Sequence, residues 1–130
     1  MTPTETVEAF IAMWNNGDFA AMEGVFTDDA VYHNIPMEPV TGKAAIMAVI
    51  NGFMADVNHC DWETHHIAAN GGVVLTERTD RFMMNSGKVA AVRVMGTFEV
   101  DSDGLISAWR DYFDSAEMAR EFGMGAPGDG

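Results

Sequence analysis

The chain has 130 residues, of which 48% are hydrophobic and 21% charged, a balance typical of a single soluble globular domain. Twenty acidic residues against seven basic ones give a net charge of −13, which excludes the basic surface of a nucleic-acid-binding protein and disfavours adhesion to an anionic membrane. No apolar run is long enough for a membrane span, and the N-terminal segment lacks the basic region of a secretory signal. A cytoplasmic location is therefore expected.

The N-terminal part of the chain predicts two helices. A capping signal, Thr2-Pro3 followed by Glu5, starts the first helix. The apolar residues of this helix recur three and four positions apart and are Val7, Phe10, Ile11 and Trp14. Gly17 ends the first helix, and Asp18 caps the second. The apolar face of the second helix consists of Phe19, Met22 and Phe26.

An extended segment and a third helix follow. Residues 30–35 are predicted to form a short strand that ends at Pro36. Thr41 then opens a helix whose apolar face consists of Ile46, Val49, Ile50 and Phe53.

The second half of the chain predicts four strands and a closing helix. Three turns rich in Gly, Asn and Asp separate strands near 60–69, 73–83, 88–100 and 105–114, and a short helix follows Ser115. Short turns imply an antiparallel meander, so the chain is expected to have an α+β fold in which three to four helices close a strongly curved, mostly antiparallel sheet into a cup. Residues 1–122 form this single domain, and residues 123–130 form a flexible tail.

Ionisable residues lie among apolar ones on two of these strands. Residues two apart share a face, so Arg78 and Asp80 lie on the same face as Phe82, and Asp111 lies on the same face as Trp109. The alternation leaves the opposite orientation open, in which the alternate residues of the strand face inward and Arg78 and Asp80 form a solvated ion pair.

The inward orientation would group two carboxylates around one guanidinium. Burial raises a carboxylate pKa, and a second carboxylate nearby separates the two values. One acid could then stay protonated while its partner stays ionised, and Arg78, always charged, would hold Asp80 and Asp111 together. Epoxide opening is one reaction that fits, because the ring oxygen gains a proton while the attacking water loses one.

Three segments of the chain resemble the limonene-1,2-epoxide hydrolase family: Val31–Pro36, Thr76–Asp80 and Trp109–Asp114. The residues that carry the resemblance are Tyr32, Asn34, Arg78, Asp80, Trp109 and Asp111. The likeness covers nearly the whole chain in the same order of elements. It implies the cone-shaped α+β barrel of the nuclear transport factor 2-like superfamily, which ketosteroid isomerases and polyketide cyclases share.

The resemblance also implies a role for each residue of the site. Asp111 is expected to take a proton from water, Tyr32 and Asn34 to hold that water, Asp80 to protonate the epoxide oxygen, and Arg78 to bridge the carboxylates. The reaction would add water in one step to give a vicinal diol. It would require no metal and no other cofactor.

The wall of the cup is expected to be apolar. Its predicted members are Trp14, Phe53, Phe82, Val92, Val94 and Phe113. The resemblance adds Trp109 as a further wall residue and N–H donor. Such a wall predicts an apolar epoxide of terpene, alicyclic or lipid-like type. A homodimer is also expected, with Met95 and Tyr112 on the covered outer face of the sheet.

Two other functions stay open at this point. An isomerase or polyketide cyclase on the same fold would use one Asp as a base and would not need the Arg78 bridge. A non-catalytic protein that binds a small apolar ligand would need none of the acid/base groups, and one fold can host many functions.

Overall fold

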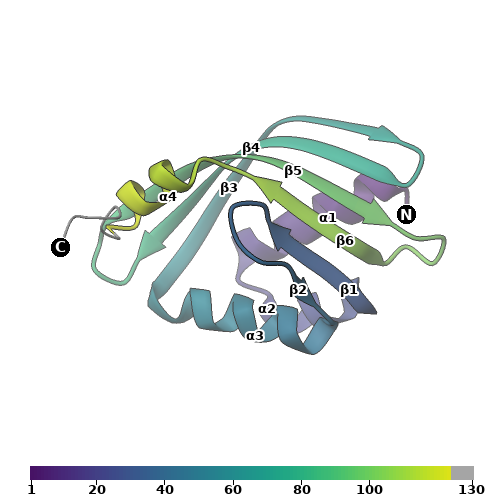
Figure 1. Ribbon diagram of the computed structural model, residues 1–130, viewed down its shortest axis with the longest axis horizontal. Coiled ribbons are helices and arrows are strands. Elements are labelled where there is room, and N and C mark those ends of the chain that lie inside the picture. The colour runs from purple at the N-terminus through teal and green to yellow at the C-terminus, as the bar shows by residue number, and fades with distance from the viewer. Residues whose placement is uncertain (124–130) are drawn as a thin grey trace.

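The computed structural model describes residues 1–123, which form four helices and one curved six-stranded sheet (Figure 1). The helices are α1 (Pro3–Asn16), α2 (Phe19–Met22), α3 (Lys43–Phe53) and α4 (Ser115–Glu121). The strands are β1 (Phe26–Asn34), β2 (Val40–Thr41), β3 (Val57–Asn70), β4 (Val73–Met84), β5 (Val89–Val100) and β6 (Ile106–Tyr112). The predicted α+β fold is confirmed.

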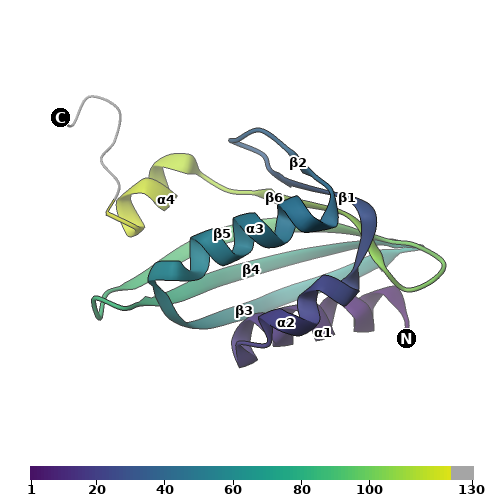
Figure 2. The same cartoon turned by 90° about the horizontal axis from the view of Figure 1, so that it is seen from below.

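The strands lie in the order β2-β1-β6-β5-β4-β3, so the sheet has two edges and does not close on itself. Every neighbouring pair is antiparallel except β1 and β6, which run parallel. Helices α1 and α3 lie on the concave side of the sheet (Figure 2). Because α1 packs mainly against β3, and α3 against β1, the two helices cover the concave face from its two sides.

The first helix forms as its capping signal predicts. The Thr2 hydroxyl accepts a hydrogen bond from the Glu5 N–H (3.1 Å), and the Glu5 carboxylate accepts one from the Thr2 N–H (2.8 Å). Gly17 ends the helix with φ 69°, a left-handed conformation that favours glycine. The four predicted apolar residues of α1 are all buried.

The second helix is shorter than predicted. It ends at Met22, and a 3₁₀ turn, Glu23–Val25, leads into β1, so Phe26 is a strand residue and not part of a helical face. Asp18 precedes α2 but makes no capping hydrogen bond with its side chain. Gly24 and the β-branched Val25 favour helix weakly. Phe26 packs on Phe10 with its ring centroid 5.4 Å away.

The segment after α2 also differs from the prediction. The predicted strand over 30–35 begins already at Phe26, and Thr41 pairs with Val31 as part of β2 and does not cap a helix. Helix α3 begins at Lys43, after Gly42, whose φ of 99° turns the chain. The four strands of the predicted meander are present as β3 to β6.

The burial pattern of the sheet decides which face of β4 points inward, a question that the sequence leaves open. On β4 the residues Val74, Thr76, Arg78, Asp80 and Phe82 are all buried, and the alternate residues face outward. The same holds on β5, where the even-numbered residues are buried. Arg78 and Asp80 therefore point into the concave side of the sheet.

The outer face of the sheet carries the two residues predicted at a dimer interface. Met95 and Tyr112 pair across β5 and β6, and each is about half exposed. A homodimer through this face stays a prediction. No helix within residues 1–123 has the length and apolar character that crossing a membrane requires. The predicted tail over 123–130 lies, except for Gly123, outside the described residues.

Candidate active site

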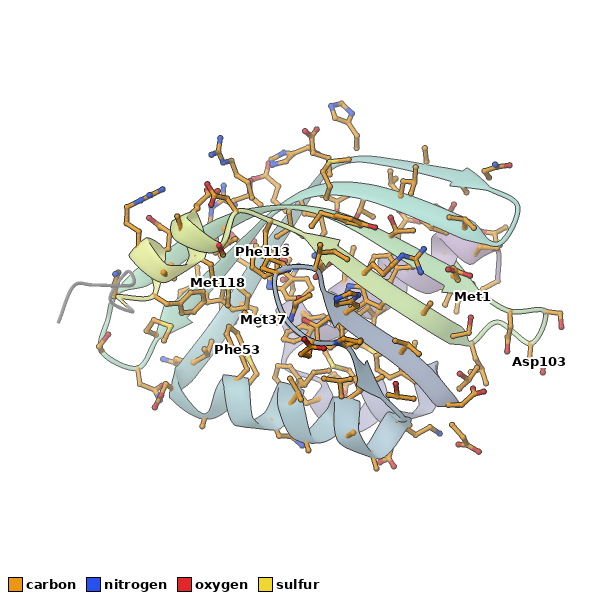
Figure 3. The ribbon with its side chains drawn as sticks, viewed as in Figure 1. Met1, Met37, Phe53, Asp103, Phe113 and Met118 are labelled. Carbon is orange, nitrogen blue, oxygen red and sulfur yellow. The ribbon has the colours of Figure 1, made fainter. Side chains whose placement is uncertain are left out.

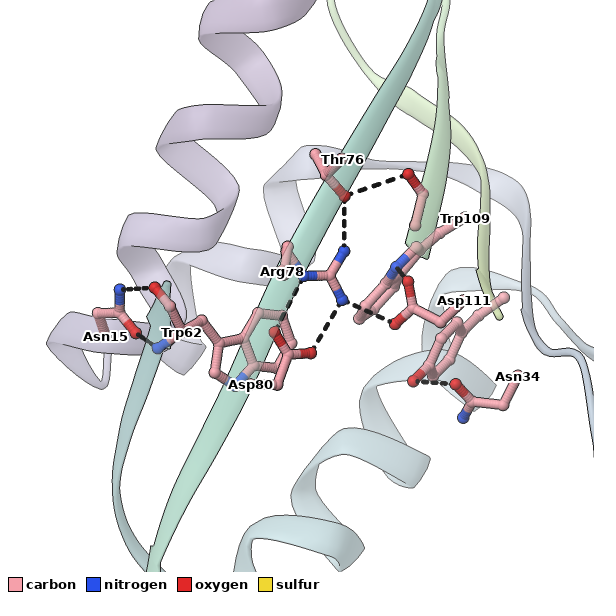
Figure 4. A network of polar contacts seen from close by, with 10 residues as sticks. Asn15, Asn34, Trp62, Thr76, Arg78, Asp80, Trp109 and Asp111 are labelled. Atoms are coloured by element: carbon pink, nitrogen blue, oxygen red, sulfur yellow. Dashed lines mark hydrogen bonds and ion pairs between the residues drawn. The ribbon is translucent and has the colours of Figure 1, made fainter. Parts of the chain in front are cut away.

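The centre of the concave face holds an arginine between two carboxylates (Figure 4). Arg78 donates from Nε to Asp80 Oδ1 (3.0 Å) and from Nη2 to Asp80 Oδ2 (2.9 Å). The same Nη2 donates to Asp111 Oδ2 at 3.1 Å. The Arg78 side chain is fully buried, and those of Asp80 and Asp111 are 5% and 6% exposed. One guanidinium thus bridges two carboxylates out of contact with bulk water.

Burial and the neighbouring charges determine the protonation states of Asp80 and Arg78. Burial raises the pKa of Asp80 to about 6, although the Arg78 guanidinium beside it acts in the opposite direction; the Asp111 carboxylate adds a smaller rise. For Arg78, burial alone would lower the pKa, but the two carboxylates outweigh it and keep the guanidinium charged. Asp80 can therefore carry a proton near neutral pH, while Arg78 cannot release one.

Besides Arg78, Asp111 has a second hydrogen-bond donor, Trp109, which lies two residues earlier on the same face of β6. The indole N–H of Trp109 donates to Asp111 Oδ1 at 2.9 Å, so each carboxylate oxygen accepts one hydrogen bond. The Trp109 ring is completely buried and stacks on the Tyr32 ring, with centroids 4.0 Å apart. Trp109 therefore fixes both the Asp111 carboxylate and the phenol of Tyr32.

Two polar side chains of β1 lie beside Asp111. In the parallel β1–β6 pair, Tyr32 lies opposite Trp109 and Asn34 opposite Asp111, and the Ile35 N–H donates to the Asp111 carbonyl at 2.9 Å. The Tyr32 hydroxyl donates to Asn34 Oδ1 at 3.0 Å. Burial, together with the Asp111 carboxylate, raises the Tyr32 pKa above its ordinary value, so the phenol stays protonated.

A cavity of about 190 Å³ opens beside these groups. Its polar lining consists of Tyr32, Asn34, Asp80 and Asp111. Six of the predicted wall residues line it as well: Trp14, Phe53, Phe82, Val92, Val94 and Phe113. The cavity is therefore polar at one place and apolar elsewhere.

Trp109 is the one predicted wall residue that does not line this cavity. It is fully buried, because Phe10 of α1, Tyr32 of β1 and Phe98 of β5 pack around its ring, with ring centroids 5.0, 4.0 and 5.7 Å away. The wall position was implied by the family resemblance, and the side-chain pattern of β6 alone does not indicate which aromatic residues pack over Trp109. Its predicted N–H donation is present, and the acceptor is Asp111.

Six further residues of the wall were not predicted: Met37, Val49, Ile50, Trp62, Met118 and Phe122. Trp62 stacks on Trp14 with centroids 4.2 Å apart, and the Asn15 side chain bonds both the N–H and the carbonyl of Trp62. Figure 3 shows labelled wall residues of α3, α4 and the loop after β1 gathered at the same end of the molecule, away from Met1.

Helix α4 brings Met118 and Phe122 to the cavity. Of strand β5, only residues 95–100 pair with β6. Helix α4 packs beside the part of β5 that β6 leaves uncovered. There Glu121 accepts the Ala91 N–H at 3.0 Å, and Glu117 pairs with Arg93 Nε at 3.0 Å. The apolar spacing of Met118 and Phe122 predicted the helix, but it did not indicate where the helix would pack.

The site offers no obvious metal ligand set, since residues 1–123 contain no group of three or more His, Cys, Asp or Glu side chains arranged to hold an ion. The polar groups that line the cavity or bridge its carboxylates are two carboxylates, a guanidinium and a phenol–amide pair.

The catalytic-domain model of the limonene-1,2-epoxide hydrolase family matches residues 1–123. The chain belongs to this family. It is 38% identical over 112 residues to epoxide hydrolase EphG of Mycobacterium tuberculosis, covering 86% of this chain and 73% of that protein. A solved structure of an M. tuberculosis LEH-like epoxide hydrolase superposes with a TM-score of 0.81 at 34% identity, over 92% of this chain and 87% of that one.

More distant structures share the fold alone. A protein from Shewanella denitrificans described as a "Putative SnoaL-like polyketide cyclase" superposes with a TM-score of 0.82 at 15% identity, covering 95% of this chain and 98% of that one. At this identity the likeness shows the curved sheet and its helices and says nothing of the site.

The buried bridge predicts a large effect of Arg78 on stability. Arg78→Gln leaves two buried carboxylates without their cation, so we expect the free energy of unfolding at pH 7 to fall by about 3–5 kcal/mol. Arg81→Gln is the matched control, since Arg81 lies on the same strand, is 33% exposed and pairs with Glu63 at the surface. Its loss should cost less than about 1 kcal/mol. Urea denaturation measures both, and equal effects would contradict the argument.

Proposed function

We propose that this enzyme adds water to an apolar epoxide in one acid/base step and releases a vicinal diol. The observation that carries the proposal is the bridge itself: Arg78 holds Asp80 and Asp111 around the polar part of an otherwise apolar cavity. Family membership supplies the reaction class.

In this proposal Asp111 is the base. One oxygen of its carboxylate accepts from Trp109 and the other from Arg78, and each keeps a lone pair for a water. Tyr32 and Asn34 lie beside it, and a phenol oxygen and an amide can each accept from or donate to the same water. These groups would orient the water toward a ring carbon while Asp111 removes its proton.

Asp80 is the acid. Its pKa of about 6 supports a protonated state near neutral pH, and its side chain lines the cavity. As the water oxygen bonds to the ring carbon, the carbon–oxygen bond breaks and the ring oxygen takes the Asp80 proton. Asp80 is then ionised and accepts two N–H bonds from Arg78, while Asp111 carries the proton from water. A proton must pass back from Asp111 to Asp80 before the next turnover.

The cavity supports an apolar substrate of terpene, alicyclic or lipid-like type. Apart from the four polar residues of the site, its lining within the described residues is aliphatic, aromatic or methionine. A substrate with polar groups away from the epoxide would lose hydrogen bonds to water, and the wall has few polar groups to replace them, namely the buried indole N–H groups of Trp14 and Trp62. Such a wall therefore favours hydrocarbon around the epoxide ring.

The two-carboxylate bridge favours epoxide opening over an isomerase or cyclase reaction. A single carboxylate base does not need a second carboxylate, and burial of an additional acid costs free energy. A pair that donates one proton and accepts another has a use for both groups.

Replacing either carboxyl group by an amide should remove most of the activity. We expect Asp80→Asn and Asp111→Asn each to lower kcat by roughly 10²- to 10⁴-fold, because an amide can act neither as the acid nor as the base. Asp61→Asn, at an exposed position of β3, is the control and should turn over normally. The assay is diol formation from a panel of cyclic and open-chain epoxides, and near-normal activity of either site variant would refute the assigned roles.

Isotope labelling separates direct attack by water from a covalent route. In a single turnover in ¹⁸O-labelled water, the label should enter the diol at once, since water itself attacks the ring. A first-turnover diol without label would mean that a carboxylate attacked the epoxide and formed an ester. The proposed one-step mechanism would then be wrong.

The acid role of Asp80 fixes the alkaline side of the pH profile. Its pKa of about 6 means that the protonated fraction is high below pH 6 and falls as pH rises. We expect kcat/KM to decline above about pH 6, approaching a tenfold loss per pH unit. Steady-state rates between pH 5 and 9 test this, and a rate that rises over the range would exclude Asp80 as the proton donor.

A further inference from the structure

The space that the Arg78 guanidinium occupies exists because residue 96 has no side chain. Gly96 lies on β5 opposite Thr76 of β4 and Asp111 of β6. A β-carbon at this position would collide with Arg78 Nη1 and lie 2.6 Å from Asp111 Oδ1. Gly96 has no positive φ, so its backbone does not require glycine. The guanidinium that crosses β5 to reach Asp111 does require it.

Thr76 holds the part of the guanidinium that the carboxylates do not reach. Asp80 and Asp111 accept from Nε and Nη2, whereas Nη1 donates to Thr76 Oγ1 at 2.9 Å. The Thr76 hydroxyl donates in turn to the Gly96 carbonyl at 3.1 Å. Thr76 is 1% exposed, so no bulk water replaces it. The rotation of the guanidinium is thereby tied to the backbone of the central strand.

Two aromatic rings restrain the same group. The Arg78 Cζ atom lies 5.1 Å from the Trp62 ring centroid and 5.9 Å from that of Phe98. The aromatic contacts limit tilting, and the Thr76 bond limits rotation within the guanidinium plane. Asp80 binds Arg78 through two bonds and Asp111 through one, so a rotated guanidinium would keep Asp80 and lose Asp111.

We propose that Thr76 and Gly96 are positioning residues that hold Arg78 in the one orientation from which Nη2 reaches both carboxylates. The catalytic consequence rests on the proposed function, in which the proton returns between those carboxylates after each turnover. The geometric claim concerns Arg78 alone and can be tested without a substrate.

The kinetic test compares two substitutions of one side chain. Thr76→Val keeps the shape but removes the hydroxyl, and we expect kcat to fall roughly 10- to 100-fold with KM changed less than about threefold. Thr76→Ser retains the hydroxyl and should restore most of kcat. Thr97→Val, on the outer face of β5, is the control and should match the unsubstituted enzyme. Equal kcat values for the Val and Ser variants would overturn the proposal.

A structural test decides the question independently of activity. In a crystal structure of the Thr76→Val variant, the guanidinium and the Asp80 carboxylate bound to it should be displaced together, so that the hydrogen bond to Asp111 is lost while the two bonds to Asp80 remain. An unmoved guanidinium would refute the positioning role. If no epoxide is turned over by the unsubstituted enzyme, the proposed function fails while this test still applies.

Gly96→Ala gives a second variant from a different strand. The added methyl must displace Arg78 or Asp111, so we expect kcat to fall roughly 10²-fold or more in the folded protein. Circular dichroism establishes whether the variant folds. A folded Gly96→Ala enzyme with unchanged kcat would contradict the proposal, and if it does not fold, the Thr76 variants decide.

Discussion

The structure depends on keeping one buried arginine satisfied. A guanidinium has five N–H donors and cannot lose its charge, so removing it from water requires acceptors in fixed directions. Here Asp80, Asp111 and the Thr76 hydroxyl accept four hydrogen bonds from it. Burial is the main cause that raises the pKa of Asp80 to about 6, Arg78 opposes it, and the Asp111 carboxylate adds a smaller rise. The burial that Arg78 requires of its partners thus gives Asp80 a pKa well above that of an exposed carboxyl group.

The fold provides this arrangement by combining neighbouring strands with a curved surface. Strand β5 lies between the strands that carry Arg78 and Asp111, and the missing side chain at Gly96 lets the two meet across it. Helices α1, α3 and α4 then surround the site with apolar side chains. Structures below 25% identity share the sheet and the helices, and a fold by itself does not specify a reaction. The proposed function therefore rests on the polar side chains of the concave face and not on the fold.

Side-chain alternation placed Arg78 and Asp80 on one face of β4 with Val74 and Phe82, but it left open whether that face points inward, which the burial of these residues in the structure decides. Local signals also predicted α1 and the strands of the meander. Phe26 follows Phe19 and Met22 at helical spacing, and this spacing predicts a helix although Phe26 is a buried strand residue. The β1–β6 pairing, the covered position of Trp109 and the docking of α4 arise from contacts between distant segments, which local patterns do not record. The requirement for glycine at position 96 was not predictable from the sequence, because it arises from the Arg78 side chain of the neighbouring strand and not from a turn or a positive φ.

The parallel pairing of β1 with β6 also has a consequence for the order of folding. Arg78 and Asp80 lie on a meander whose strands are joined by short turns, and such local contacts form early. Asn34 and Asp111 meet only when a long loop closes, at a greater loss of chain entropy. We therefore expect the ion pair of Arg78 and Asp80 to assemble first. The cluster of Tyr32, Asn34 and Asp111 would be completed in a later, slower step, so a partly folded chain would already contain both carboxyl groups of the meander but not the two polar side chains of β1 beside Asp111.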